Sequence, residues 1–237
     1  MQLKNHRSLP LCFVDQSDLP ANLAYETFIS CYGKVPTRLN LHDFFNALVW
    51  LTFPGIKARL NALQSAAIEK TGSAVRGKLR DAATLFDENA ALVVVDDLSW
   101  LALLREHAWQ TLFVDQRAQF QQSSNTWLFG HALMEKLVHP YKSITAHAWV
   151  IVIPADHAYW RSDHDGKLAC LDLMVETQLD ESLTSLDFTP LPVLGLSGWW
   201  PDQDAGFYGD LDVFRPRRRN RCREKNADRC PDADKQR

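Results

Sequence analysis

Apolar residues in this chain recur mostly three and four positions apart, which is the spacing of one face of an α-helix. The clearest example is the segment 41–52, which Asn40 can cap and Phe53-Pro54-Gly55 ends, with Asp43 placed as in a capping box. Its apolar positions predict a broad stripe that faces the core, formed by Leu41, Phe44, Phe45, Leu48, Leu51 and Thr52.

Similar patterns predict further helices. Asp18 can cap a helix over 19–32, and Gly33 follows its end. Asn125 or Thr126 can cap a helix over 127–138, which stops before Pro140. The segments 41–52 and 56–70 are expected to pack as a helical hairpin, and 111–114 fits either a helix or a strand. The further helices are predicted over 19–32, 56–70, 78–86, 98–109, 127–138 and 167–179.

Strands are fewer. The β-branched run 90–95 and the apolar runs 149–153 and 191–196 predict strands, and 35–38 is extended because a residue before proline avoids helical angles. Residues 197–216 form an aromatic loop. Because helices outnumber strands and the two do not strictly alternate, the expected fold class is α+β, predominantly helical with a small sheet.

The composition predicts a single globular domain over 11–216, with a flexible N-terminus at 1–10 and a basic disordered tail at 217–237. Hydrophobic residues make up 46% of the chain, yet no apolar run reaches the ~18 residues of a membrane span. The short run at 9–14 is interrupted by Asp15, so an export signal is not expected. The five cysteines are scattered and odd in number, which favours reduced thiols in a cytoplasmic protein without membrane contact.

Charge is unevenly distributed. Residues 215–237 hold ten basic and four acidic side chains, a net +6, whereas the other 214 residues hold 16 basic and 25 acidic, a net −9. Such a tail could contact nucleic acid, but no aromatic residue is interleaved to stack on bases, so a solvated terminus is favoured.

The first candidate site lies on the helix 41–52. His42, Asn46 and Trp50 are spaced four residues apart, with Asp43 beside them, and this polar stripe ending in tryptophan suggests a second buried face. His42 would act as a base or ligand there, oriented by Asp43 or Asn46. The alternative is an ordinary helix start whose polar side chains face water.

A second candidate combines His131 and Glu135, four residues apart on one predicted helix, with His147 from a following loop. Two helix residues and one loop residue are a common way to hold a catalytic divalent metal. The alternative is an exposed hydrogen bond and an interior histidine. Gly130 indicates a close backbone approach at this point.

A third candidate surrounds Arg80, Asp87 and Glu88. Arg80 and Asp87 share a helix face, and the two carboxylates could offer hard oxygen ligands to magnesium or calcium. The alternative is a buried structural ion-pair network.

Several phrases together resemble a mainly proteobacterial family of conserved hypothetical proteins, classed as a domain of unknown function with no established activity. The resemblance spans about residues 10–216 and implies that the polar phrases around His42, Asp87, His131 and His147 belong to one shared site. The phrases lie at 35–46, 80–81, 86–89, 129–132, 135–137, 146–148, 190–195, 198–200 and 213–216.

Two functional hypotheses follow. In the first, the chain is a metal-assisted hydrolase acting on a phosphoester or amide, with His131, Glu135 and His147 as ligands, and with Asp43 or Glu88 as general base. Arg38 or Arg80 would bind the anionic part of a small-molecule substrate. In the second, it is a non-catalytic binding or adaptor protein that meets a partner protein, and its polar groups form a structural network.

Overall fold

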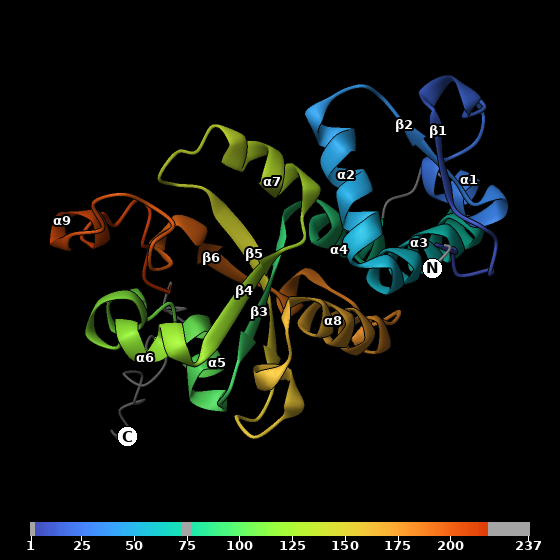
Figure 1. Ribbon diagram of the computed structural model, residues 1–237. Coiled ribbons are helices and arrows are strands. Elements are labelled where there is room, and N and C mark those ends of the chain that lie inside the picture. The colour runs from blue at the N-terminus through green and yellow to red at the C-terminus, as the bar shows by residue number, and fades with distance from the viewer. Residues whose placement is uncertain (1–2, 73–76, 218–237) are drawn as a thin grey trace, which may run out of the picture.

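The computed structural model describes residues 3–72 and 77–217, and its architecture is α+β with helices in the majority. A four-stranded sheet lies at the centre with helices on both faces, and a two-stranded sheet lies near the N-terminus (Figure 1). The strands are β1 (Cys12–Asp15), β2 (Lys34–Thr37), β3 (Ala90–Val95), β4 (Ser124–Leu128), β5 (Thr145–Val152) and β6 (Thr189–Pro192). The helices are α1 (Tyr25–Tyr32), α2 (Leu41–Thr52), α3 (Pro54–Thr71), α4 (Lys78–Asn89), α5 (Leu98–Arg105), α6 (Arg117–Gln122), α7 (His131–Val138), α8 (His164–Gln178) and α9 (Ala205–Tyr208).

The central sheet has the order β4-β3-β5-β6, with β3 parallel to β5 and the other pairs antiparallel. Every residue of β3 is fully buried. Leu92 and Val94 pack in one cluster with residues of α3, α4 and α8, whereas Ala91 and Val93 pack in a second with residues of α5 and α6. Because β3 is covered on both faces, its sequence is a continuous apolar run and does not alternate.

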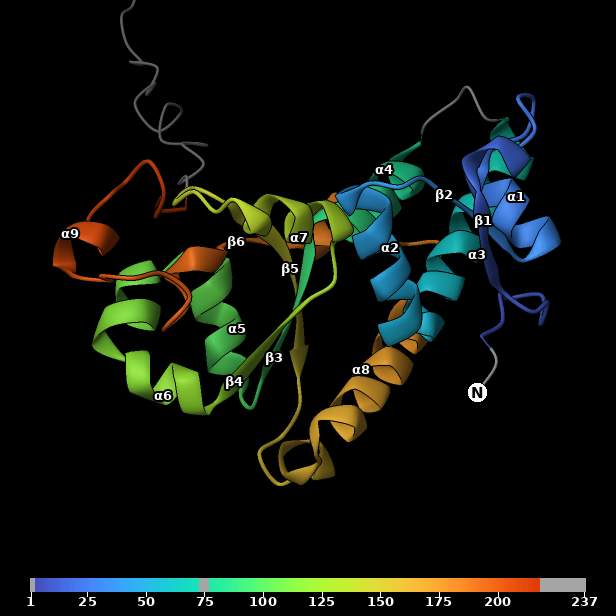
Figure 2. The ribbon, with the colours of Figure 1, turned by 45° about the horizontal axis from the view of Figure 1, so that its top comes forward.

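The N-terminal helices form a layer that positions the candidate site. α3 packs against α1, α4 and α8, while α2 packs against α7 (Figure 2). β1 and β2 pair in parallel beside α1. As a result, α2 is held between α3 and α7.

Many of the predicted elements are present. The helix 41–52 and the strand 90–95 have the predicted bounds, and 56–70 and 78–86 lie within α3 and α4. Gly33 ends α1 in the left-handed conformation at φ 65°, as a C-terminal glycine commonly does. The strand 149–153 overlaps the longer β5, and the helix 167–179 overlaps α8.

Other boundaries were wrong. The predicted helix 127–138 is divided, because Thr126 and Trp127 pair with β3 as part of β4 and the helix begins only at His131. The helix 19–32 begins at Tyr25, and 98–109 ends at Arg105 before a π-helical turn over Thr111–Asp115. The strand 191–196 corresponds to β6 followed by a 3-10 turn over Val193–Gly195.

The inward stripe predicted for α2 was also wrong. Leu41, Phe44 and Leu51 are 47%, 54% and 57% exposed, whereas Asp43, Asn46, Val49 and Trp50 are buried. The helix is turned this way because its polar side chains find partners on α1, α3 and the β2–α2 connection. A satisfied polar network and Trp50 therefore occupy the inner face.

Both ends of the chain were predicted to be loose. Within the described residues, Asn5 donates hydrogen bonds to the carbonyls of Ile29 and Ser30 at 2.8 and 2.9 Å, which ties the N-terminal segment to α1. The predicted tail lies outside the described residues except for Arg217. Among the helices of the described segments, none has the length and apolar character needed to cross a bilayer.

Candidate active site

A polar cavity of about 310 Å³ lies where α1, α2 and α4 meet the start of α7. Its lining is mostly charged or hydrogen-bonding, and the residues come from segments far apart in the sequence. They are Gln16, Leu19, Tyr25, Glu26, Pro36, Arg38, His42, Asp43, Asn46, Gln64, Thr84, Asp87, Glu88 and His131.

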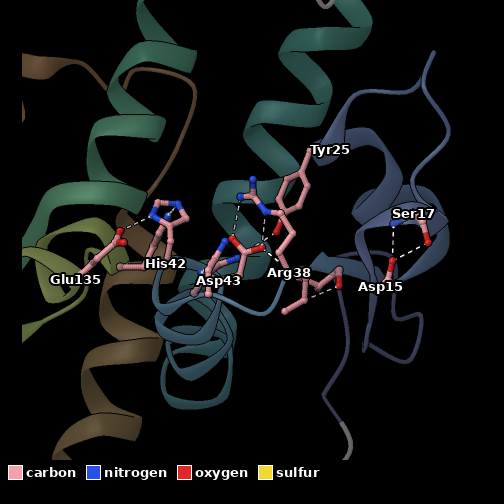
Figure 3. A network of polar contacts seen from close by, with 12 residues as sticks. Asp15, Ser17, Tyr25, Arg38, His42, Asp43 and Glu135 are labelled. Carbon is pink, nitrogen blue, oxygen red and sulfur yellow. Dashed lines mark hydrogen bonds and ion pairs between the residues drawn. The ribbon is translucent and has the colours of Figure 1, made fainter.

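The start of α2 supplies an ion pair to this lining. Asn40 accepts a hydrogen bond from the backbone N–H of Asp43 at 2.8 Å and so caps the helix, which leaves the Asp43 carboxylate for other partners. Arg38 donates to that carboxylate from its backbone at 2.6 Å and from Nε and Nη2 at 2.9 and 3.0 Å (Figure 3). Burial alone would raise the pKa of Asp43, but these Arg38 contacts hold the pKa below its usual value.

A second ion pair is buried beneath the cavity. Lys57, only 4% exposed, donates to Asp87 Oδ1 at 2.5 Å and to Asn46 Oδ1 at 2.8 Å. Burial would raise the pKa of Asp87, but the Lys57 charge and then the nearby His131 keep the pKa low. Asn46 also donates to the Tyr25 hydroxyl at 3.0 Å, so α1, α2, α3 and α4 are joined by one polar chain.

Two histidines from α2 and α7 meet at the cavity. The Nε2 atoms of His42 and His131 are 3.1 Å apart, with the ring planes 82° from parallel. Glu135, one turn after His131, lies 3.0 Å from His42 Nδ1, and Figure 3 shows its carboxylate beside the His42 ring. A carboxylate in this place fixes the orientation of the imidazole and stabilises its positive charge.

The hydrogen bonds assign the protons of the neutral pair. Since the Glu135 carboxylate accepts, His42 Nδ1 carries its proton and His42 Nε2 accepts from His131 Nε2. His131 Nδ1 is then without a proton; it has almost no accessible surface, it makes no hydrogen bond of good geometry within the described residues, and the Asp87 backbone lies beside the ring. Nδ1 lies 3.9 Å from Asp87 Oδ2, too far for a direct hydrogen bond. Burial, opposed by the charge of Asp87, lowers the pKa of His131 to about 4.

Gly130 places His131 at the cavity. A Cβ on Gly130 would lie 2.5 Å from the Glu88 carbonyl oxygen and 2.6 Å from the Ala90 nitrogen. The start of α7 therefore lies against the end of α4, beside Asp87. This confirms the close backbone approach that the sequence indicates.

The structure brings most of the predicted site residues together, and it does so across the three separate candidates. His42, Asp43, Asn46, Asp87, Glu88 and His131 line the cavity, and Glu135 contacts His42 from behind. Arg80 lies on α4 outside this lining. His147 lies in β5 opposite Ala90, half-buried, with its ring beside Phe188 and also outside the lining.

The predicted metal ligands are not assembled as a group. Glu135 contacts His42 and not His131, and His147 is elsewhere. Across residues 3–72 and 77–217, no three His, Cys, Asp or Glu side chains are placed so that they could hold a metal ion. A divalent metal stays a prediction of the sequence.

The sequence reasoning missed Lys57. The pattern that could have indicated it is the spacing of Lys57, Asn61 and Gln64, which places all three on one face of α3. All three are buried, so they form a polar stripe on the inner face of this helix. Tyr25 and Glu26 were missed as well, since nothing in their local pattern distinguishes them.

A protein-family model described as "Protein of unknown function (DUF3025)" matches residues 11–218, which is most of the chain. The chain belongs to this family. The predicted resemblance to a family of unknown function is thereby confirmed. Neither the curated proteins nor the solved structures contain a match.

This DUF3025 protein therefore carries a cavity lined by two contacting histidines, His42 and His131, with the Glu135 carboxylate hydrogen-bonded to His42. The hydrogen bonds run from the partly exposed Glu135 through His42 to His131, and the buried Asp87 carboxylate lies 3.9 Å from His131 Nδ1 without a direct hydrogen bond to it. Such a chain can move a proton between the surface and the cavity without leaving a charge on the buried ring.

Proposed function

We propose that this cavity is the active site of a hydrolase that uses the His42–His131 pair as its general base. The observation that carries the proposal is the Glu135–His42–His131 hydrogen-bond chain, which links a partly exposed carboxylate to two histidines that line the cavity. A general base must present a lone pair within hydrogen-bond reach of the proton it removes.

His131 Nδ1 has almost no accessible surface in the structure, so the proposed reaction begins with a small rotation of the His131 ring that admits a water to Nδ1. The water donates to Nδ1 while its oxygen bonds to the carbonyl carbon of an ester or amide. As His131 takes the water proton at Nδ1, it passes its Nε2 proton to His42. The positive charge then lies on His42 beside Glu135 and not on the buried ring, where burial disfavours it. The proton returns along the same path to the leaving oxygen or nitrogen as the carbonyl bond to it breaks.

The test is turnover of a panel of chromogenic esters, amides and phosphoesters by the full-length protein. His131→Gln and His42→Gln should each lower kcat/KM about 100-fold or more. Glu135→Gln, which removes the orienting charge, should lower it about 10-fold to 100-fold. The matched control is His139→Gln, an exposed histidine just beyond α7, which should keep wild-type turnover.

Activity that chelation removes and a divalent metal restores would replace this mechanism with a metal-assisted one. A panel without any His42-dependent turnover would contradict the hydrolase. Thermal unfolding of each variant separates lost chemistry from lost folding.

One observation favours the alternative, a non-catalytic binding protein. The outer face of α2 exposes Leu41, Phe44, Leu48 and Leu51, and aligned apolar side chains of this kind are typical of interaction surfaces. In that case His42→Gln would change stability alone, and no substrate would be turned over.

A further inference from the structure

Two surface hollows meet beside α5, where the C-terminal segment of the described chain ends. Their volumes are about 690 and 540 Å³, and they share no lining residue with the polar cavity of the candidate active site. His107 and Arg217 line both hollows, so the two form one groove, here called the α5 groove. α5 lies on the other side of β3 from α3 (Figure 2), and the groove is therefore a separate surface of the molecule.

One end of the α5 groove is apolar. Leu98, Leu101 and Arg105 follow helical spacing, so they lie on one face of α5. Leu98 is 66% exposed, and Leu186, which lines the same hollow, is 89% exposed. Exposed leucines gathered in a hollow are typical of interaction surfaces, because covering them removes apolar area from water.

The other end of the groove is basic. Arg105, at the C-terminal end of α5, makes no ion pair or hydrogen bond within residues 3–72 and 77–217. Arg215 and Arg217 also line the groove, against the acids Glu106 and Asp212. Arg217 is ion-paired with Glu106, whereas Arg215 donates from Nε to the backbone carbonyl of Asp212 at 2.8 Å. With three arginines against two acids, the lining itself carries one net positive charge.

The sequence adds positive charge at this end. Six of the nine residues 215–223 are arginine and none is acidic. Trp109 Nε1 donates to the Arg215 carbonyl at 2.8 Å, which fixes the start of this run beside the groove. The acids that adjoin the two leucines in the sequence, Asp97 and Asp187, are at the other end, where both accept hydrogen bonds from backbone N–H groups. The groove is thus apolar at one end and positive at the other.

This lining suits side chains of a peptide better than nucleic acid or an added strand. Bases bind to exposed ring faces, but Trp109 is 5% exposed and stacks on His107 with the ring centroids 5.2 Å apart. The edge strand β6 contributes Pro190 and Pro192, which have no N–H to donate to a further strand. Recognition is therefore expected through apolar and charged side chains.

We infer that the α5 groove binds an acidic amphipathic segment of a partner protein. Its apolar side chains cover Leu98 and Leu186, and its carboxylates lie against Arg105 and Arg215. Charge complementarity selects this occupant, because the chain outside residues 215–237 carries a net −9 and repels an acidic segment, whereas the basic end of the groove attracts it. The inference does not depend on the proposed hydrolase.

The test is fluorescence anisotropy of a labelled helical peptide, titrated with the full-length protein. Leucines in this peptide recur at helical spacing, and most other positions are glutamate. The peptide should bind, and more weakly as salt is raised. A peptide with lysine in place of each glutamate, and one with serine in place of each leucine, should bind at least about tenfold more weakly.

Substitutions on the protein locate the binding. Leu98→Ser and Leu186→Ser should each weaken it about tenfold, because each removes apolar area that the peptide covers. Arg105→Glu should weaken it about tenfold or more, because an attraction becomes a repulsion. The matched controls are Leu39→Ser and Lys4→Glu, two exposed side chains in the N-terminal part of the fold, and both should leave the affinity unchanged. All five side chains are exposed, and thermal unfolding checks that each variant is folded.

Absence of binding, equal binding of the lysine or serine peptide, or an unchanged affinity in the three groove variants would each overturn the inference. An equal loss in Leu39→Ser would do so as well, because it would place the peptide beside α2. Oligouridine and phosphatidylserine vesicles should not displace the peptide. Displacement by the RNA would assign the surface to nucleic acid, and displacement by the vesicles would assign it to a membrane.

Discussion

At the scale of single residues, the site depends on charges that are buried in pairs. Lys57 and Asp87 are 5% and 14% exposed in their side chains, and each offsets the desolvation of the other. Asn46 fixes the geometry by accepting from Lys57 and donating to Tyr25. Such a network stabilises the fold when it is complete, and removing one member leaves an uncompensated charge.

Replacing Lys57 with methionine should therefore destabilise the protein by about 3–5 kcal/mol, because Asp87 would remain buried without its cation. Lys70→Met is the matched control on the same helix. Lys70 pairs with Glu181 at the surface, where both side chains are more than 60% exposed. Lys70→Met should therefore lower the free energy of unfolding by at most about 1 kcal/mol. Urea denaturation measures both, and equal losses would contradict the buried pair.

His131 makes stability depend on pH. Burial lowers the pKa of His131 to about 4, whereas an unfolded histidine titrates near about 6.5. Between these values the unfolded state binds more protons, so the stabilisation is complete above about pH 6.5 and is lost as the pH falls toward 4. The loss is at most about 3 kcal/mol.

Denaturant unfolding at about pH 7 and about pH 4.5 checks this dependence. His131→Gln should lose less stability between the two values than the wild type does, because it lacks the titrating ring. His139→Gln should lose as much as the wild type. An identical pH dependence in all three proteins would show that His131 is not kept neutral by the fold.

At the scale of elements, the spacing of residues predicts where α2 begins and ends but not which face is buried. Asn40 and Phe53-Pro54-Gly55 define its ends through local backbone chemistry. The apolar stripe at Leu41, Phe44 and Leu51 was assigned to the core because hydrophobic periodicity takes no account of buried polar partners. Those partners, Lys57 and Tyr25, belong to other helices and are absent from the local pattern.

The helix assigned to 127–138 was wrong for a related reason. Thr126 and Trp127 can lie in a helix or in a strand. They form part of a strand here because they pair with Val93 and Leu92 of β3. Gly130 then separates the strand from α7. The sequence indicates its role in close packing, because glycine at a helix start loses more conformational entropy on folding than other residues and is expected there only where a side chain would not fit.

Gly130→Ala should destabilise the protein by about 1–3 kcal/mol, because the new methyl group meets backbone atoms that cannot move aside easily. It should also weaken any His42-dependent turnover, since α7 would be pushed away from α4. Gly206→Ala in α9 is the matched control, as its Cβ would meet nothing closer than 3.4 Å. Thermal unfolding and kcat/KM measure the two effects, and a Gly130→Ala protein as stable as the control would contradict the close approach.

At the scale of the whole molecule, the sequence predicts the composition of the site better than its assembly. His42, Asp43, Asn46, Asp87, Glu88 and His131 were assigned to three separate candidates, and the fold joins them in one cavity. Which groups meet depends on contacts between residues about 40 to 90 positions apart, and local spacing carries no information on these. For this reason the contact between His131 and His42 could not be foreseen, nor the position of His147 outside the cavity that the other residues line.

β3 connects the two halves of the interior and should make their unfolding cooperative. Leu92 and Val94 belong to the core beneath α3, α4 and α8, whereas Ala91 and Val93 belong to the core beneath α5 and α6, so neither core can open while β3 stays packed in the other. Urea unfolding followed by far-UV circular dichroism and by tryptophan fluorescence should give coincident transitions. Leu92→Ala and Val93→Ala, which create cavities in different cores, should each shift both signals to the same lower midpoint. Two separated transitions, each sensitive to one substitution, would show instead that the two cores fold independently. In that case the site, which lies on the side of α3 and α4, would not depend on the core beneath α5 and α6.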